Sequence, residues 1–297
     1  MDFAVHYSRA AADLLAAGQI AFDRYKCPAW PDLLDMIGTS HPLYVHFPLR
    51  VGTGTGDAID TETGQPPDWG KFERLLARTG TPYLNLHLEP MAPDHPDLHP
   101  HSADPDQIAR VTDSLLRDIA AVVARFGPER VILENVPDDG DLTLRPAYLP
   151  AVIREVVVAS GCGFLFDLSH ARLAALRLGL DARDYIAALP VEHTREIHLT
   201  GIQLFDETWV KRCRQHNAPE ATVARFAGRM MDHLPLTDDD WTFTAWAMGE
   251  VKRGAWGRPH AIALECGGVG PLWEATMDRA TLAAQAPRLA HLIADAR

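Results

Sequence analysis

The stretch "VILENV", residues 131–136, decides the fold that this sequence predicts. Its apolar residues Val131, Ile132 and Leu133 are typical of a buried strand, and they run directly into Glu134 and Asn135. A carboxylate at the end of a buried strand is costly unless it is paired with a positive charge or bound to a cation. The rest of the sequence therefore has to provide partners for Glu134.

Seven further short runs are also apolar or β-branched and bounded by turn residues. They lie at 3–8, 21–27, 43–49, 83–88, 163–169, 196–201 and 261–266. Segments with helical periodicity lie between them, and several end at a glycine, such as Gly80, Gly127 and Gly161. Strands that alternate with helices pair in parallel through helical crossovers. Eight such units in 297 residues predict a single α/β domain over 1–297, folded as a (β/α)8 TIM barrel.

A doubly wound open sheet is the alternative fold, but the sequence lacks its dinucleotide-binding loop. The segment "GTGTG" at 52–56 follows a strand but opens no helix and lacks the full glycine spacing, so we interpret it as a flexible loop. The proline-rich segment 89–104 contains His95, His99 and His101, which we expect to be solvated.

Composition narrows the function classes. The chain is 47% hydrophobic and 23% charged, as in ordinary globular enzymes, and its net charge is −12. Binding to nucleic acid or to an anionic membrane needs clustered Lys and Arg, so we expect neither partner. The N-terminus shows no signal peptide, and the four cysteines form no CxxC pair, so we expect a reduced, cytoplasmic enzyme.

Polar residues collect at the predicted ends of strands three to eight, where a TIM barrel carries its chemistry. Alone, each has an ordinary interpretation, such as a hydrogen-bonded core histidine or, for Asp167, a helix N-cap. Together they predict a metal site, because imidazole and carboxylate suit Fe, Mn, Zn or Co. The candidate ligands are His46, His87, Glu134, Asp167, His170, His198, His233 and Glu265.

Eight candidate ligands exceed the three or four that a single catalytic metal takes, so two or three metals are expected. Glu134 is suited to bridge two of them. Asp232 and Asn135 are expected to support the ligands without binding metal, although Asn135 also fits a turn before Pro137. We interpret Cys266 as a packing residue.

The motifs also carry a family resemblance. The order "LENV", "FDLSH", "IHLTG", "DDDWTFTAWAM" and "IALECGGVGPLWEA" resembles the multinuclear non-haem iron-dependent oxidases, formerly a domain of unknown function, which include the methanobactin-biosynthesis oxidase. The family motifs match at His46 in "YVHFPLR", His87 in "LNLHLEP", Glu134-Asn135, Asp167, His198 and Glu265. Two positions depart from the pattern. His170 replaces an Asn, and in "MDH", residues 231–233, Met231 stands where the family has an Asp.

The resemblance implies a xylose-isomerase-like barrel that holds two or three Fe ions, with zinc or manganese as the alternative. It also implies an O2-using oxidase that modifies cysteine or a neighbouring residue of a ribosomally made peptide. A separate leader-peptide-binding partner protein is implied as well.

Three other readings stay open. The first is a divalent-metal-dependent sugar isomerase or epimerase on the same barrel. Such enzymes commonly need a Lys or a carboxylate pair at strand ends, and the strand ends here carry His in preference to Lys, which argues against this function. The second is an endonuclease-IV-like metal hydrolase, which the acidic net charge disfavours. The third is a non-enzymatic binding barrel, which has no need to collect metal ligands at one rim.

Overall fold

The computed structural model describes residues 1–137, 140 and 142–297, and the chain divides into two compact units. The first unit comprises Met1–Cys27, Thr39–Pro42 and Ile197–Arg297. The second unit comprises Pro28–Gly38 and Leu43–Glu196.

The second unit is built on a mainly parallel sheet. Its strands β8 (Gly163–Asp167), β7 (Val131–Glu134), β6 (Leu84–Leu88) and β4 (Leu49–Val51) are neighbours in that order, and β5 (Ile59–Asp60) pairs antiparallel with β4. All four residues of β7 are buried, as expected for a strand covered on both faces. The other elements of this unit are α2 (Pro31–Ile37), β3 (Leu43–His46), α3 (Trp69–Thr79), η1 (Ala92–Asp94), α4 (Pro105–Phe126), η2 (Pro128–Arg130), η3 (Arg145–Tyr148), α5 (Pro150–Ser160), α6 (Leu168–Leu178), α7 (Ala182–Ala188) and η4 (Val191–His193).

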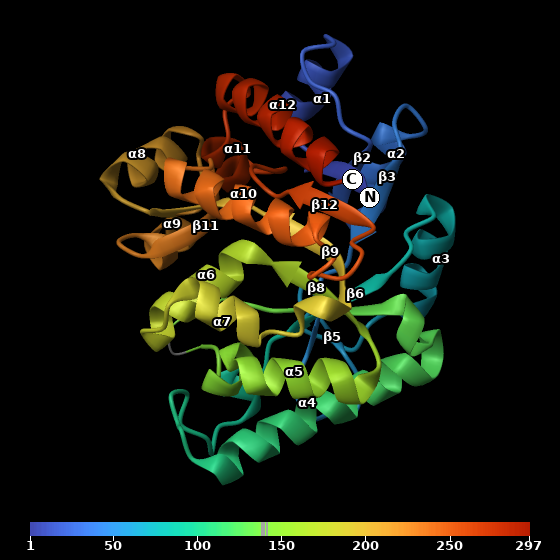
Figure 1. Cartoon of the computed structure of the whole chain (residues 1–297), viewed down its shortest axis with the longest axis vertical. Coiled ribbons are helices and arrows are strands. Elements are labelled where there is room, and N and C mark those ends of the chain that lie inside the picture. The colour runs from blue at the N-terminus through green and yellow to red at the C-terminus, as the bar shows by residue number, and fades with distance from the viewer. Residues whose placement is uncertain (138–139, 141) are drawn as a thin grey trace. The chain divides into compact units, whose positions relative to one another are not determined.

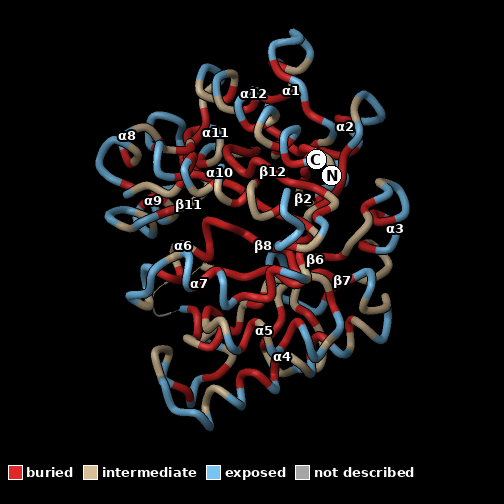
Figure 2. The backbone as a smooth tube through the Cα atoms, viewed as in Figure 1, coloured by how far each residue is buried: buried red, intermediate tan, exposed pale blue. Residues whose placement is uncertain are grey.

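Helix α4 shows how the sequence specifies these elements. The Asp104 side chain caps its first turn by accepting a hydrogen bond from Asp106 N, and Pro105 takes the first helical position. Buried residues recur at helical spacing along it, so one face packs into the unit and the other is solvated. Figure 1 shows α4 beside α5, and Figure 2 shows the alternation of buried and exposed positions along α4.

The first unit contains a second set of parallel strands. Strand β1 (Asp2–His6) lies between β2 (Arg24–Pro28) and β12 (Ala261–Leu264), and β9 (Thr194–Leu199) follows β12. A separate antiparallel pair joins β10 (Gly201–Leu204) to β11 (Met230–Leu234). The helices of this unit are α1 (Arg9–Ala16), α8 (Glu207–Gln215), α9 (Glu220–Phe226), α10 (Asp238–Lys252), α11 (Pro271–Thr276) and α12 (Arg279–Ala296).

The predicted α/β class is confirmed, since each of the eight apolar runs overlaps a strand of the structure. The glycines predicted to end helices, Gly80, Gly127 and Gly161, are each the C-cap of one. The closed eight-stranded barrel and the single domain over 1–297 stay predictions. The helical periodicity of "APEATVARFAGRMM", residues 218–231, predicts a helix that is too long, because Met230 and Met231 lie in β11 and the helix before them ends at Phe226.

The segment "GTGTG" is a loop, as predicted, and its amides are hydrogen-bonded to a buried side chain. Gly52, Gly54 and Gly56 all have positive φ angles, and their amides point at the buried carboxylate of Asp118 in α4. Asp118 accepts from Gly52 N and Gly54 N, both at 3.0 Å, and from Gly56 N at 2.8 Å. Successive backbone amides of this kind form an anion-binding concavity, here filled by the protein's own carboxylate.

The expectation that all three histidines of segment 89–104 are solvated is wrong for His95. His95 is buried, and its Nε2 lies 2.7 Å from the carbonyl oxygen of Gly52. His99 is exposed and His101 is half-buried. His95 therefore helps to hold the loop that follows β4.

In the part of the chain that the structure describes, none of the helices combines the length and the apolar content needed to cross a lipid bilayer.

Replacement of Asp118 by Ala should destabilise the protein, because three loop amides lose their acceptor together. We expect a loss of about 2–3 kcal/mol in the free energy of unfolding, measured by urea denaturation. Asp113→Ala is the matched control, since Asp113 lies exposed on the same helix. Equal stability of the two variants would show that Asp118 does not fix the loop.

Candidate metal centre

Parallel strand pairing places His87 and Glu134 side by side in the second unit. They are register partners on β6 and β7, and each lies at or near the carboxyl end of its strand. Register partners on neighbouring strands project from the same face of a sheet. Glu134 is 1% exposed, so its charge has to be met by groups inside the protein.

His46, at the end of β3, completes a triangle with this pair. His46 Nε2 lies 3.3 Å from His87 Nε2. Glu134 Oε2 lies 3.4 Å from His46 Nε2 and 3.2 Å from His87 Nε2. Donor atoms about 2.05 Å from one tetrahedral metal ion lie about 3.3 Å from each other, so these three atoms have the spacing of a metal-binding face.

A hydrogen bond on the far side of the ring orients His87, whereas His46 is contacted at the Nε2 atom that faces Glu134. His87 Nδ1 lies 2.9 Å from the carbonyl oxygen of Leu49, which is a bond that Nδ1–H donates. A neutral imidazole that donates from Nδ1 carries its lone pair on Nε2, the atom that faces Glu134. Metal-binding histidines commonly have such a bond to a backbone carbonyl. Asn85 Nδ2 lies 3.2 Å from His46 Nε2 and also donates to the carbonyl of Phe47, which fixes the position of His46.

Asp167 and His170 form the next part of this unit. Asp167 ends β8 and is the N-cap of α6, because its Oδ1 accepts from Ser169 N at 2.7 Å and from His170 N at 2.8 Å. Its other oxygen, Oδ2, lies 3.8 Å from His170 Nε2. The N-cap interpretation of Asp167 is thus correct for one carboxylate oxygen, and only the second oxygen faces the imidazole.

Asn135 clamps the end of β8. Its side chain donates to the carbonyl of Asp167 at 2.9 Å and accepts from Asp167 N at 3.0 Å. The carbonyl of Asn135 in turn lies 2.8 Å from His170 Nδ1. Asn135 therefore holds both Asp167 and His170 in position, as expected for a residue that supports ligands through hydrogen bonds.

In the first unit, the candidate ligands gather around Glu265. His198 Nδ1 lies 2.8 Å from Glu265 Oε2, and both side chains are buried. His233 Nδ1 lies 2.9 Å from the carbonyl oxygen of Glu265, which again assigns the lone pair to Nε2. Asp232 Oδ2 lies 3.8 Å from that Nε2.

His233 has a backbone conformation that is rare for its residue type. It lies on β11 rather than in a segment leading into a helix, and its φ is 56°, in the left-handed region. A left-handed non-glycine residue is strained, and such residues concentrate at functional sites.

Two polar residues that sequence reasoning missed lie at the same strand ends. His6 ends β1 and pairs in register with Lys26 on β2, while Val5 pairs with Leu264, so Glu265 follows at the level of His6. Lys26 is 1% exposed and forms an ion pair with Glu265 Oε1. Lys26 is thus an exception among strand ends that otherwise carry His, and it lies near the carboxyl end of β2. Applying the strand-end rule to the runs 3–8 and 21–27 finds both residues.

The charges of this cluster are set by burial and by mutual contact. Burial by itself raises the pKa of Glu265, but the charges of His198 and Lys26 outweigh it and hold the pKa well below the ordinary value. Glu265 is therefore ionised at neutral pH. Burial, followed by the charge of Lys26, lowers the pKa of His6 to about 3, so the His6 imidazole is neutral.

Cys266 is a packing residue, as expected. It is buried, and its Sγ donates to the carbonyl of Leu234 at 2.8 Å. Burial raises the pKa of its thiol to about 12. Cys27, Cys162 and Cys213 are also buried, and burial raises the pKa of each.

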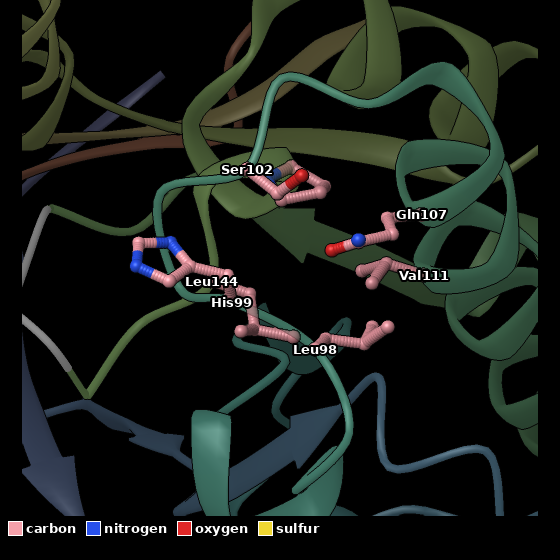
Figure 3. A pocket seen from close by; sticks show the side chains of 7 residues that line it. Leu98, His99, Ser102, Gln107, Val111 and Leu144 are labelled. Atoms are coloured by element: carbon pink, nitrogen blue, oxygen red, sulfur yellow. The ribbon is translucent and has the colours of Figure 1, made fainter.

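A small pocket in the second unit lies apart from the candidate ligands. It is lined mainly by apolar side chains, with His99, Ser102 and Gln107 among them (Figure 3). None of the eight candidate ligands lines it.

Comparison with protein families identifies relatives of this chain. The model of the family described as "RiPP precursor modification enzyme MbnB/TglH/ChrH" matches residues 28–226, more than half of the chain. A UPF0276 protein of Bordetella pertussis is 45% identical over 92 residues, which cover 30% of this chain and 32% of that relative. The match thus spans about a third of the length of this relative. A UPF0276 protein of Caulobacter vibrioides is 27% identical over 234 residues, 74% of this chain and 78% of that one.

Two solved structures share the fold at low sequence identity. A xylose isomerase domain containing protein from Salmonella typhimurium aligns over 98% of this chain and 97% of its own, with a TM-score of 0.52 and 14% identity. D-psicose 3-epimerase from Clostridium cellulolyticum aligns over 100% and 99%, with a TM-score of 0.51 and 11% identity. They show an α/β fold of the xylose-isomerase kind.

The four cysteines should be unreactive in the folded protein. Thiolate is the reactive form, and raised pKa values leave all four thiols protonated at pH 8. We expect iodoacetamide at pH 8 to label less than about a tenth of the thiols in native protein within an hour, and all four after unfolding in guanidinium. Rapid labelling of any native cysteine, located by mass spectrometry, would contradict the burial described above.

Proposed function

This chain belongs to the family described as RiPP precursor modification enzymes MbnB/TglH/ChrH, and from that premise we propose that it is a metal-dependent oxidase that modifies a ribosomally made peptide. The observation that supports the metal most directly is the triangle of His46, His87 and Glu134, whose sides measure 3.2–3.4 Å. A closed barrel of the xylose-isomerase kind is part of this proposal.

The proposed metal is iron, with two or three ions per chain and zinc or manganese as the alternative. The donor set of imidazoles and carboxylates fits each of these metals. Iron would supply the transfer of electrons from the peptide to dioxygen. Beyond the triangle, the proposed ligands are Asp167 and His170 in the second unit and His198, His233 and Glu265 in the first.

The residues of the chain itself do the positioning. Glu134 offers a negative charge in a buried place, where it attracts a cation more strongly than it would in water. The bond between His87 Nδ1 and Leu49 and the Asn135 clamp on Asp167 keep the ligands in fixed orientations. A bound metal therefore finds a largely preformed set of donors.

The proposed substrate is a precursor peptide in which a cysteine or a neighbouring residue is oxidised. The four cysteines of the chain are buried, so the reacting sulfur is that of the substrate. A separate partner protein that binds the leader peptide is proposed as well.

The experiment that tests this function starts with protein purified without oxygen. Two or more irons per chain by elemental analysis, followed by dioxygen uptake and a mass change in a cysteine-containing precursor peptide encoded near the gene, would support the proposal. Zinc as the only metal, together with phosphodiesterase activity, would refute it.

A second candidate function is a metal-dependent sugar epimerase or isomerase. The observation that favours it is the buried Lys26 at a strand end, a residue type that such enzymes use and that sequence reasoning had missed. Interconversion of ketohexoses by the metal-loaded protein under argon, with no consumption of dioxygen, would decide for this alternative.

Glu134→Gln should remove metal while leaving the fold intact. The amide keeps the size of the side chain but loses the charge, so metal affinity should fall by more than the roughly 10–100-fold that supporting residues contribute. Equilibrium dialysis with Fe2+ under argon measures it, and circular dichroism reports the fold. Glu129→Gln is the control, because Glu129 is exposed just before the same strand. Full metal occupancy in Glu134→Gln would show that Glu134 is not a ligand.

A further inference from the structure

Lys26 is a buried charged residue of the first unit that the proposed function does not use. It is 1% exposed, and its ammonium contacts Glu265 Oε1. A buried ammonium is stable only with a carboxylate close by, and a buried pair is badly destabilised if one partner is removed. The ion pair is therefore a fixed part of this strand end.

Both oxygens of Glu265 already have a partner within the first unit. Oε1 contacts Lys26, and Oε2 lies 2.8 Å from His198 Nδ1. A divalent cation added at Glu265 therefore meets a carboxylate whose two oxygens are already in contact with Lys26 and His198.

The two carboxylates Glu134 and Glu265 differ in the chemistry of their partners. Glu134 Oε2 faces the Nε2 atoms of His46 and His87, and a neutral imidazole offers a lone pair to a metal ion. An ammonium has three donors and no lone pair, so Lys26 repels a metal ion where an imidazole binds it. A metal ion reaches Glu265 Oε1 only if the ammonium moves away.

We propose that Lys26 is a resident counter-cation of Glu265 that a metal ion has to displace, so that Glu265 takes up metal after, and more weakly than, the site of His46, His87 and Glu134. This inference rests on the proposed role of Glu265 as a metal ligand. It assigns Lys26 a positioning role that sets the order in which metals load.

The test is an anaerobic titration with Co2+, whose visible absorption reports each coordinated ion. Wild-type protein should show one tight and one weaker binding step. In Lys26→Met the weaker step should tighten by at least about tenfold, because the competing charge is gone. Lys252→Met is the matched control, since Lys252 is exposed in α10, and it should titrate like the wild type.

Thermal unfolding gives a second readout that does not depend on activity. Without metal, Lys26→Met should melt below the wild type, because Glu265 has lost its counter-charge. Added Co2+ should raise its melting temperature more than that of the wild type, as tighter binding to the native state stabilises it further. Lys26→Gln, which keeps a hydrogen-bond donor, provides the same comparison if the Met variant does not fold.

The outcomes separate this inference from the proposed function. Identical Co2+ titrations of wild type, Lys26→Met and Lys26→Gln, or weaker binding in both variants, would overturn the role of Lys26 while leaving the metal centre in place. If Glu134→Gln lost no part of the Co2+ binding seen in the wild type, the proposed function itself would be overturned.

Discussion

The buried carboxylate of Glu134 is the constraint on which the second unit depends. Its charge lies at the end of a strand whose four residues are all buried, so it has to be compensated locally. Parallel pairing with β6 places His87 beside Glu134. His46, at the end of β3, lies with its Nε2 3.4 Å from Glu134 Oε2. The bond from His87 to Leu49 and the clamp of Asn135 then follow as the means by which these neighbours are held.

Much of this arrangement could be predicted from the sequence. The strands were readable because each is a short apolar run between turn residues, and the eight candidate ligands could be named because chemistry collects at strand ends. The residues His46, His87 and Glu134 indeed come together, and the family expected from the ordered motifs is confirmed. The identity of the metals and the roles of the other five candidate ligands stay predictions.

Other features could not be predicted, for identifiable physical reasons. Strand β11 has the sequence "MMDHL", in which two methionines continue the apolar pattern of the preceding helix, and only pairing with β10 makes it a strand. The contact of Asp118 with Gly56 spans 62 residues, so no local pattern signals it. The ion pair of Lys26 with Glu265 spans 239 residues, so the sequence around Lys26 gives no sign of its partner.

The glycine loop after β4, residues 52–56, limits which anions its backbone amides can bind. Phosphate groups in barrel enzymes are commonly bound by the amides of a loop or of a helix terminus. Here the amides of Gly52, Gly54 and Gly56 are saturated by Asp118, which presents a negative charge of its own. A phosphorylated metabolite would therefore find the amides of these three glycines already bound to a carboxylate, so this loop does not offer the amide cradle that binds phosphate in barrel enzymes.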